Sequence, residues 1–393
     1  MRPRRRDLAA TLFRVGLTSF GGPAIVAQIR ETVVVRERWV SEEEFQESLA
    51  FCQLLPGPIA VQTAAHIGWR LHGGLGAAIA LASYTAPAFL LMLVLSVAYF
   101  RFHELPAVVV AMRGLAAAIV AIVAHAIWGL AQPTLRDWRG LAIAALAAAG
   151  LFAGLDTLLV LALAAAAGVA CAHFGLCEVD PALDPATAPR SAPSWRRTLA
   201  ASLAVAAGFV AVVALSGRLN PALPSLGATL AKINLLAFGG GYTAIALMHQ
   251  DFVADSGHAL LTSEEFVAGL ALGQVTPGPV ILTATFIGVR VAGLVGGVFA
   301  TVCVLLPSAL LLVTLAPLFA RLRDARFVRG AIRGLLAGFV AILLVVLYHV
   351  CQSAFVTTWA PLVSLACLAA LRLRAPMGAV LLAAIAAAAL LPA

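Results

Sequence analysis

Apolar segments follow one another along almost the whole chain, and they restrict the possible folds more than any other feature. Thirteen such segments lie between residues 7 and 393, and many reach the ~20 residues that a helix needs to cross a bilayer. Hydrophobic residues make up 62% of the chain and charged residues 11%, whereas a soluble domain has about 25% charged residues. The alternating pattern of a membrane barrel is absent. The sequence therefore predicts an all-α polytopic membrane protein embedded in a lipid bilayer.

The positive charge of the chain has an ordinary explanation in such a protein. The formal net charge is +8, but cytoplasmic loops of membrane proteins collect lysine and arginine. No nucleic-acid partner is therefore expected. The six cysteines form no C-x-x-C pair and are interpreted as small buried apolar residues. Neither a metal site nor a cofactor is predicted.

The sequence repeats itself at an offset of 218–221 residues. QLLPGP at 53–58 matches QVTPGP at 274–279, IGWR at 67–70 matches IGVR at 287–290, and AMRGLAAAIVAI at 111–122 matches AIRGLLAGFVAI at 331–342. The register holds over more than a hundred residues. The chain is therefore interpreted as a tandem duplication of a six-segment unit.

The two copies are expected to insert with opposite orientation. The expected organisation is a first transporter repeat at 7–174, a linker with one extra helix at 175–224, and a second transporter repeat at 225–393. Matching segments then lie seven segments apart. Because seven is an odd number, the second copy has the opposite orientation if every segment crosses the membrane. Such inverted repeats are typical of transporters that alternate access to a midplane site. Loop arginines favour a cytoplasmic N-terminus; segments 7–29 and 225–248 are left open as re-entrant.

Helix breakers recur at matching places in both copies. GGP at 21–23 and GGG at 239–241 interrupt the first segment of each copy, and PGP at 56–58 and 277–279 interrupts the second. Proline removes a backbone donor, and glycine lets the backbone approach a ligand closely. Broken backbone in a bilayer is tolerated only where protein or water satisfies it. Each break also exposes a helix N-terminus, which attracts anions. The breaks are therefore predicted to form one midplane anion site.

Two cations are expected to contribute charge to this site. Arg14 and Lys232 lie inside apolar segments at matching positions of the repeat. A cation at that depth costs at least about 2.5–3.5 kcal/mol, so it persists where it faces water, a partner or a ligand. Arg113 and Arg333 form a second matching pair near segment starts. Glu47 is the best acidic candidate at that depth. The acidic runs at 42–44 and 264–265 follow Ser41 and Ser263 and are interpreted as first turns of capped helices, and Asp251 is interpreted as a loop or segment-end residue.

Neutral polar side chains beside the breaks complete the predicted site. Gln53 and Gln274 precede the two PGP triplets. Further hydroxyl and amide groups flank the four breaks: Thr18, Ser19, Gln62, Thr63, Asn234, Tyr242, Thr243, Thr276, Thr283 and Thr285. A histidine proton relay is not favoured, because no histidine in an apolar segment has a histidine counterpart in the other copy. The predicted substrate-binding residues are Arg14, Lys232, Gly21, Gly22, Gly57, Pro58, Gly239, Gly240, Gly278, Pro279, Gln53 and Gln274.

The motifs FGGP, QLLPGP, FGGGYTAI and GQVTPGP together resemble those of the chromate ion transporter family (the CHR superfamily), in its long-chain, two-domain form. The resemblance covers roughly 10–130 and 228–350. It implies export of chromate from the bacterial cytoplasm across the inner membrane, and chromate resistance. The matching motif positions here are Phe20 to Pro23, Gln53, Pro56 to Pro58, Phe238 to Gly241, Gln274, and Pro277 to Pro279. One departure is Cys52, where the second copy has Gly273.

The main hypothesis is a secondary transporter for a tetrahedral oxyanion, chromate or sulfate, that works by rocking of one repeat against the other. The sequence contains no P-loop motif, so direct driving by ATP is not expected. Export of a dianion from a negative-inside cell would release about 4.6 kcal/mol per 100 mV. A homodimer is possible. Two alternatives stay open: a membrane-embedded enzyme that acts on a lipid phosphate, and a channel or uniporter on the same fold.

Overall fold

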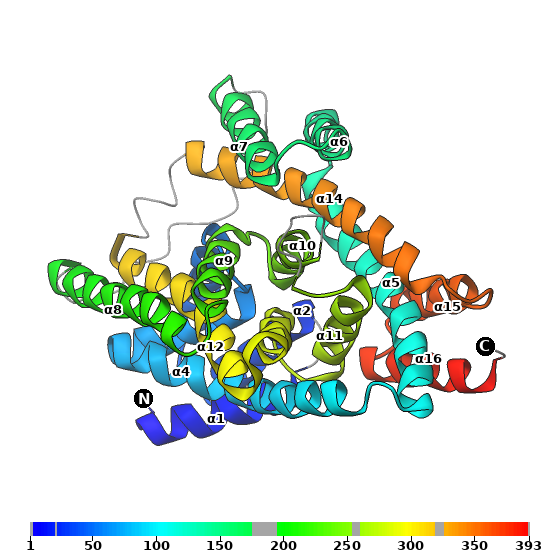
Figure 1. The fold of residues 1–393 in the computed structure, drawn as a ribbon. Helices are drawn as coiled ribbons and strands as arrows, with labels where there is room; N and C mark the ends of the chain where they lie inside the picture. The colour runs from blue at the N-terminus through cyan, green and yellow to red at the C-terminus, as the bar shows by residue number, and fades with distance from the viewer. Residues whose placement is uncertain (1–2, 20–21, 175–194, 254–259, 319–325, 392–393) are drawn as a thin grey trace.

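The computed structural model describes residues 3–19, 22–174, 195–253, 260–318 and 326–391 of the chain, and these residues are helical between short turns (Figure 1). The elements of the first copy and the extra helix are α1 (Arg5–Thr18), α2 (Gly22–Arg30), a π-helical turn (Glu31–Arg36), α3 (Glu42–Leu54), α4 (Ile59–Phe102), α5 (Pro106–Thr134), α6 (Trp138–Phe152), α7 (Thr157–His173) and α8 (Trp195–Leu215). Those of the second copy are α9 (Leu223–Leu236), α10 (Gly241–Phe252), α11 (Ser263–Val275), the short η3 (Val280–Leu282), α12 (Thr283–Leu315), α14 (Arg326–Ala354), α15 (Ala360–Arg372) and α16 (Met377–Leu390).

Five helical stretches in the described part of the chain are long and apolar enough to cross a membrane. They lie at Ile59–Phe102, Pro106–Thr134, Thr198–Arg218, Val280–Leu315 and Phe327–Ala354. The stretch in α8 is almost wholly exposed, including Val210 at 64% and Leu203 at 61%. Such an apolar surface would be unstable in water but is satisfied by lipid. Composition and exposure thus agree on a polytopic membrane protein.

The two longest helices are each bent back at a glycine. The backbone of α4 leaves the helical region at His72 and Gly73 (φ 63°), and that of α12 does so at Ala292 and Gly293 (φ 57°). The turn in α4 separates the apolar segment at 42–69 from the one at 75–100. The turn in α12 separates the matching segments of the second copy. In each helix the two arms touch at glycines: a Cβ on Gly68 would lie 2.3 Å from the Gly76 carbonyl oxygen, and one on Gly288 2.1 Å from that of Gly296.

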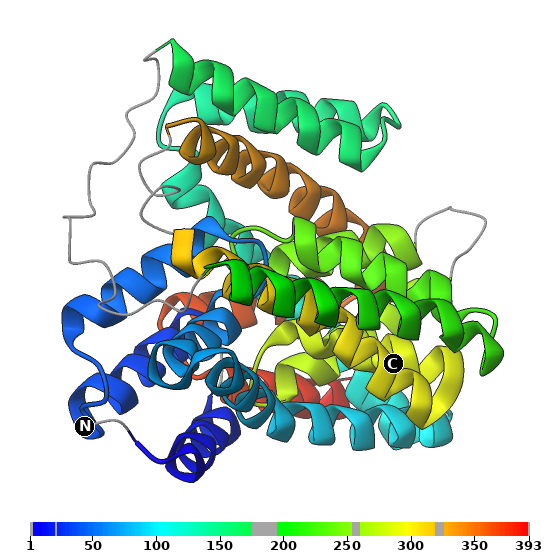
Figure 2. The same cartoon turned by 90° about the vertical axis from the view of Figure 1, so that its left-hand side faces the viewer.

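The C-terminal hairpins of the two copies are exchanged. Helices α6 and α7 of the first copy pack on α14 of the second, and α15 and α16 of the second pack on α5 of the first. Figure 1 shows α6 and α7 beyond α14, with α15 and α16 beside α5, and Figure 2 shows the α6–α7 pair as a layer over α14. The boundaries expected at 174 and 225 therefore do not separate two independently packed bodies.

Glycines at equivalent positions make the exchanged contacts possible. A Cβ on Gly114 of α5 would lie 2.4 Å from the Ala384 carbonyl oxygen of α16, and one on Gly334 of α14 would lie 2.0 Å from the Ala164 carbonyl oxygen of α7. The two glycines match one another at the repeat offset, and so do the two alanines, so the two contacts are equivalent. Small residues at helix crossings are what membrane helices use to bring backbones together. An Arg-Gly-Leu sequence surrounds each of these glycines, and it marks where a hairpin docks in each copy.

Substitution of one such glycine should weaken this docking. We expect Gly114→Ala to destabilise the protein by about 1–3 kcal/mol, because the new methyl group forces α16 away from α5. Gly129→Ala, in the same helix, is the matched control, because a Cβ there would meet nothing within 4 Å. Thermal unfolding of the purified protein in detergent measures both variants. Equal melting temperatures for the two variants would contradict the crossing.

Candidate functional site

The first PGP triplet lies between two helices and reaches across to the second copy. Helix α3 ends at Leu54 and α4 begins at Ile59 with Pro58 as its N-cap residue. Gly57 has φ +117°, a conformation that favours glycine. Its amide donates a 2.7 Å hydrogen bond to the carbonyl of Ala237, the residue that follows α9. The first break is therefore held by the end of the first helix of the other copy.

The second PGP triplet repeats this arrangement in reverse. Gly278 has φ +123° and its amide donates a 2.7 Å hydrogen bond to the carbonyl of Ser19, which follows α1. Pro279 occupies the N-cap position of η3. Reciprocal contacts of this kind are what a two-fold axis produces. They also revise one prediction, because the amides of Gly57 and Gly278 are paired with carbonyls in this conformation and are not free to bind an anion.

The glycine motif of the second copy lies beside the second PGP triplet. Gly239 (φ +81°) and Gly240 (φ +119°) precede α10, which begins at Gly241. A Cβ on Gly241 would lie 3.7 Å from the amide nitrogen of Ile281 in η3. Of the matching motif in the first copy, Gly21 lies outside the described residues and Gly22 is the first residue of α2.

The described members of the motifs thus form one continuous cluster. The PGP glycines bridge to the ends of α1 and α9, and the start of α10 joins the second triplet. The N-termini of α4 and α10 both begin in this cluster. First-turn amides of a helix have no partner within that helix and carry partial positive charge. The cluster therefore combines the first-turn amides of α4 and α10 with carbonyl groups at the ends of α1, α3 and α9.

The two predicted glutamines differ in their surroundings. Gln274 is 4% exposed and lies beside the hydroxyl group of Tyr242. Gln53 is exposed on α3. The repeat in sequence therefore does not produce two identical half-sites.

The two predicted cations also differ. The ammonium of Lys232 on α9 forms a 2.8 Å ion pair with Asp251 on α10. Arg14 is exposed on α1 and has no ion pair among the described residues. Asp251 was expected at a segment end, and spacing does not indicate its pairing with Lys232, because the two residues lie 19 positions apart on separate helices. Lys232 is thus a paired cation, whereas Arg14 is not.

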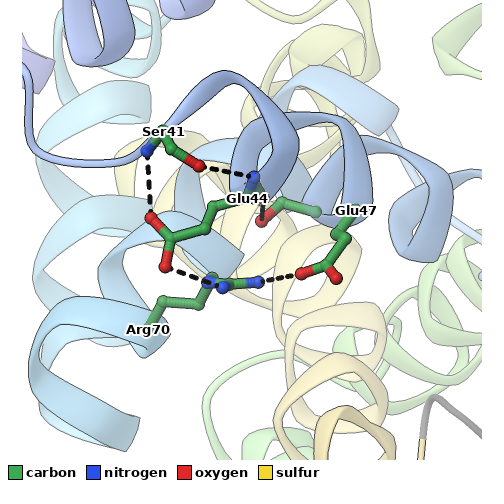
Figure 3. Close-up of polar contacts among 5 residues, drawn as sticks. Ser41, Glu44, Glu47 and Arg70 are labelled. Atoms are coloured by element: carbon green, nitrogen blue, oxygen red, sulfur yellow. Dashed lines mark hydrogen bonds and ion pairs between the residues drawn. The ribbon is translucent and has the colours of Figure 1, made fainter. Parts of the chain in front are cut away.

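Glu47 has a structural partner. Arg70 near the end of the first arm of α4 donates to Glu47 at 2.9 Å and to Glu44 at 3.1 Å, as Figure 3 shows. The side chains of Arg70 and Glu47 are 11% and 13% exposed. In the second copy the matching arginine, Arg290, forms an ion pair with Glu265 at 2.9 Å. These ion pairs fix α3 and α11 against the following helices. Arg333 is likewise paired, with Asp137 at 2.8 Å.

The acidic runs at 42–44 and 264–265 are first-turn residues of capped helices, as expected, but one cap differs. Ser41 caps α3 through a bond from the Glu44 amide. In the second copy the cap is Thr262 rather than Ser263, because the Thr262 hydroxyl accepts from the Glu265 amide. The true repeat offset of 221 places Thr262 opposite Ser41.

Polar side chains from both copies surround Gly57. A Cβ on Gly57 would lie 2.7 Å from the Ser308 hydroxyl and 2.8 Å from the Gln62 amide nitrogen. The Asn234 side-chain oxygen accepts a 2.7 Å hydrogen bond from the Ser308 amide. Gln62 and Asn234 were expected beside the breaks, but Ser308 was missed, and only its place after the paired Pro307 could have indicated it. Across the described residues, no group of three or more His, Cys, Asp or Glu side chains could hold a metal ion.

Comparison with known proteins gives a consistent result for both copies. The family model described as chromate transporter matches residues 6–169 and 224–391. The chain is 34% identical to a chromate transport protein of Pseudomonas aeruginosa over 77% of this chain and 70% of that protein. It is 28% identical to a chromate transport protein of Cupriavidus metallidurans, over 80% and 75%, and 28% identical to an uncharacterized transporter of Methanocaldococcus jannaschii, over 88% and 84%.

No solved structure matches the chain. The family model covers most of both copies, and relatives named as chromate transport proteins align with most of the chain. The chain therefore belongs to the chromate transporter family, in its long two-domain form, and is a multi-pass membrane protein.

Proposed function

We propose that this protein is a secondary transporter that exports chromate across the bacterial inner membrane and thereby confers resistance to it. The observation that carries this proposal is the convergence of the family motifs in one cluster, where helix N-termini from both copies begin. Helix N-termini favour tetrahedral oxyanions through their free amides and their dipole. The relatives named as chromate transport proteins favour chromate over sulfate as the substrate.

The inverted insertion of the two copies is part of this proposal. The reciprocal bonds of Gly57 and Gly278 support a two-fold axis, and the odd number of expected crossings places that axis in the membrane plane. The N-terminus is then cytoplasmic.

The movement that alternates access would differ from rocking of one whole copy against the other, because the hairpins α6–α7 and α15–α16 are each docked on the other copy. One moving group would contain α1 to α4, α8, α9 and α12, and the other would contain α5 and α14 with the exchanged hairpins. Helices α10 and α11 contact members of both groups and lie between them. A Cβ on Gly239 would contact Leu336 of α14 and Leu130 of α5, so the anion cluster borders the second group.

Labelled chromate uptake into inverted vesicles tests the transport activity. We expect saturable uptake that depends on the membrane potential, because moving one elementary charge is worth about 2.3 kcal/mol per 100 mV. Flux that does not saturate would support a channel instead. Turnover of a lipid phosphate by the purified protein without chromate uptake would support the enzyme alternative.

The left-handed glycine of the second break should be essential for transport. In Gly278→Ala the methyl group would lie 2.6 Å from the Ala88 side chain, at a backbone φ of +123°. Strain of this kind costs about 1–3 kcal/mol, and relief of it breaks the bond to Ser19. We expect loss of chromate uptake at normal membrane abundance. Gly74→Ala, which would meet nothing within 4 Å, should leave uptake unchanged, and equal uptake by both variants would contradict this role.

The charges of Arg14 and Lys232 can be tested separately. We expect Arg14→Ala to lower chromate uptake at least about tenfold, which corresponds to about 1.4 kcal/mol. Lys232→Ala leaves Asp251 unpaired, so it should lower both stability and uptake. The double variant Lys232→Ala/Asp251→Ala should regain thermal stability but not uptake. Full uptake by the double variant would show that Lys232 serves only to neutralise Asp251.

A further inference from the structure

The polar cluster around Gly57 contains two amide side chains whose orientation is fixed by backbone partners. The Gln62 amide nitrogen donates to the Pro56 carbonyl, which can only accept, so the side-chain oxygen of Gln62 faces away from it. The Asn234 oxygen accepts from the Ser308 amide, which can only donate, so the Asn234 amide nitrogen is turned outward.

Both outward atoms are buried without a partner among the described residues. Gln62 is 2% exposed and Asn234 is fully buried, and neither the Gln62 oxygen nor the Asn234 nitrogen has a hydrogen bond. The Ser308 hydroxyl is nearly free as well, since its bond to the Leu305 carbonyl is 3.5 Å long. Leaving a buried polar atom unpaired costs about 1–3 kcal/mol. Two such atoms around one glycine indicate a ligand that can both donate and accept.

The second break differs in its unpaired atoms. Beside it the Gln274 amide nitrogen, a donor, is buried without a partner among the described residues, but no amide oxygen is. The repeat places Gly16 opposite Asn234 and Ala88 opposite Ser308, and Gln62 has no polar counterpart, because TAAHIGWR at 63–70 matches TATFIGVR at 283–290 and Leu282 precedes the latter. An unpaired acceptor beside a break is therefore not a requirement of the fold, because the same backbone arrangement exists at Gly278 without one.

We propose that Gln62, Asn234 and Ser308 bind the transported oxyanion in its singly protonated form. The Gln62 oxygen accepts the O–H of the ligand, and the Asn234 amide donates to a deprotonated oxygen. The Ser308 hydroxyl and the first-turn amides of α4 supply further donors. This inference rests on the proposed transport of chromate and identifies which protonation state of it is bound.

The charge of the surroundings favours a monoanion. The three side chains are neutral, and the positive potential comes from the N-terminus of α4, which is equivalent to about half an elementary charge. Desolvation of an ion rises steeply with its charge, so a neutral pocket accepts a monoanion at much lower cost than a dianion. Hydrogen chromate and chromate interconvert near neutral pH, whereas sulfate carries no proton there. Gln62 would therefore distinguish the two substrates.

Other titratable and charged groups lie on the helices around the cluster. They include Arg14 on α1, Glu47 and Cys52 on α3, His66, Arg70 and Tyr84 on α4, Lys232 on α9, Tyr242, His249 and Asp251 on α10, and Cys303 on α12. Glu47 with Arg70, and Lys232 with Asp251, are ion pairs. The imidazole of His66 is packed between Phe51 and Trp69, and that of His249 lies beside Phe266 and His349. The ordinary titration range of a histidine overlaps that of hydrogen chromate. His66 lies on the same helix as Gln62, so it needs a control.

The experiment measures uptake of labelled chromate into proteoliposomes with the pH equal on both sides, at several values around neutrality. We expect the KM for total chromate to rise about tenfold for each unit of pH on the alkaline side, because hydrogen chromate binds much more tightly than the dianion. Sulfate is a dianion throughout this range and should compete only weakly, with an inhibition constant that does not change with pH. A KM that stays constant with pH while uptake continues would overturn the protonated-ligand inference and leave the transport function standing. Absence of saturable uptake at every pH would overturn the proposed function itself.

Two variants identify the residues. Gln62→Met removes the acceptor at similar volume and should raise the KM for chromate about tenfold or more and remove its pH dependence, while inhibition by sulfate is retained. Loss of the fold could not produce that combination. Asn234→Leu should weaken the binding of both chromate and sulfate. Thr283→Val, at the start of α12 beside the second break, and His66→Phe should keep the wild-type KM and its pH dependence. An unchanged KM in Gln62→Met would overturn the assignment, as would loss of the pH dependence in His66→Phe.

Discussion

Two hydrogen bonds from glycine amides hold the centre of this molecule together. Gly57 and Gly278 both adopt left-handed backbone conformations, and each donates to the carbonyl that ends the first helix of the other copy. A helix end inside a bilayer must find partners for its free carbonyl groups. The PGP triplets provide one donor for each such end. These two bonds hold the interrupted helices in place, and they join the two copies where the helix N-termini begin.

The repeat supplies a symmetric frame, and the chemistry depends on departures from it. The docking glycines Gly114 and Gly334 are matched, as are the bends at Gly73 and Gly293. The polar groups are not. The Gly57 break carries an unpaired amide oxygen and an unpaired amide nitrogen, whereas at the Gly278 break Ala88 stands opposite Ser308 and the unpaired atom is the Gln274 amide nitrogen.

Much of the fold could be predicted from the sequence, because the repeat and the helix breakers are local signals. The interrupted motifs and the capped acidic runs needed only spacing and residue type. Contacts between distant segments could not be predicted in the same way. The pairing of Lys232 with Asp251, and of Arg70 with Glu47, depends on how helices cross, which residue type and spacing do not reveal. The exchange of hairpins depends on the absence of a side chain at Gly334, where a Cβ would lie 2.0 Å from the Ala164 carbonyl oxygen, far away in the chain.

The central claim, that the two copies are inserted with opposite orientation and interlock around one anion site, is tested most directly by the sidedness of matched positions. Gly74 and Leu294 are equivalent exposed residues at the bends of α4 and α12. Single cysteines at these positions, in a background without other cysteines, can be labelled with a reagent that does not cross the membrane. The account predicts that Leu294→Cys is labelled in intact cells and Gly74→Cys only in inverted vesicles. Labelling of both from the same side would contradict it.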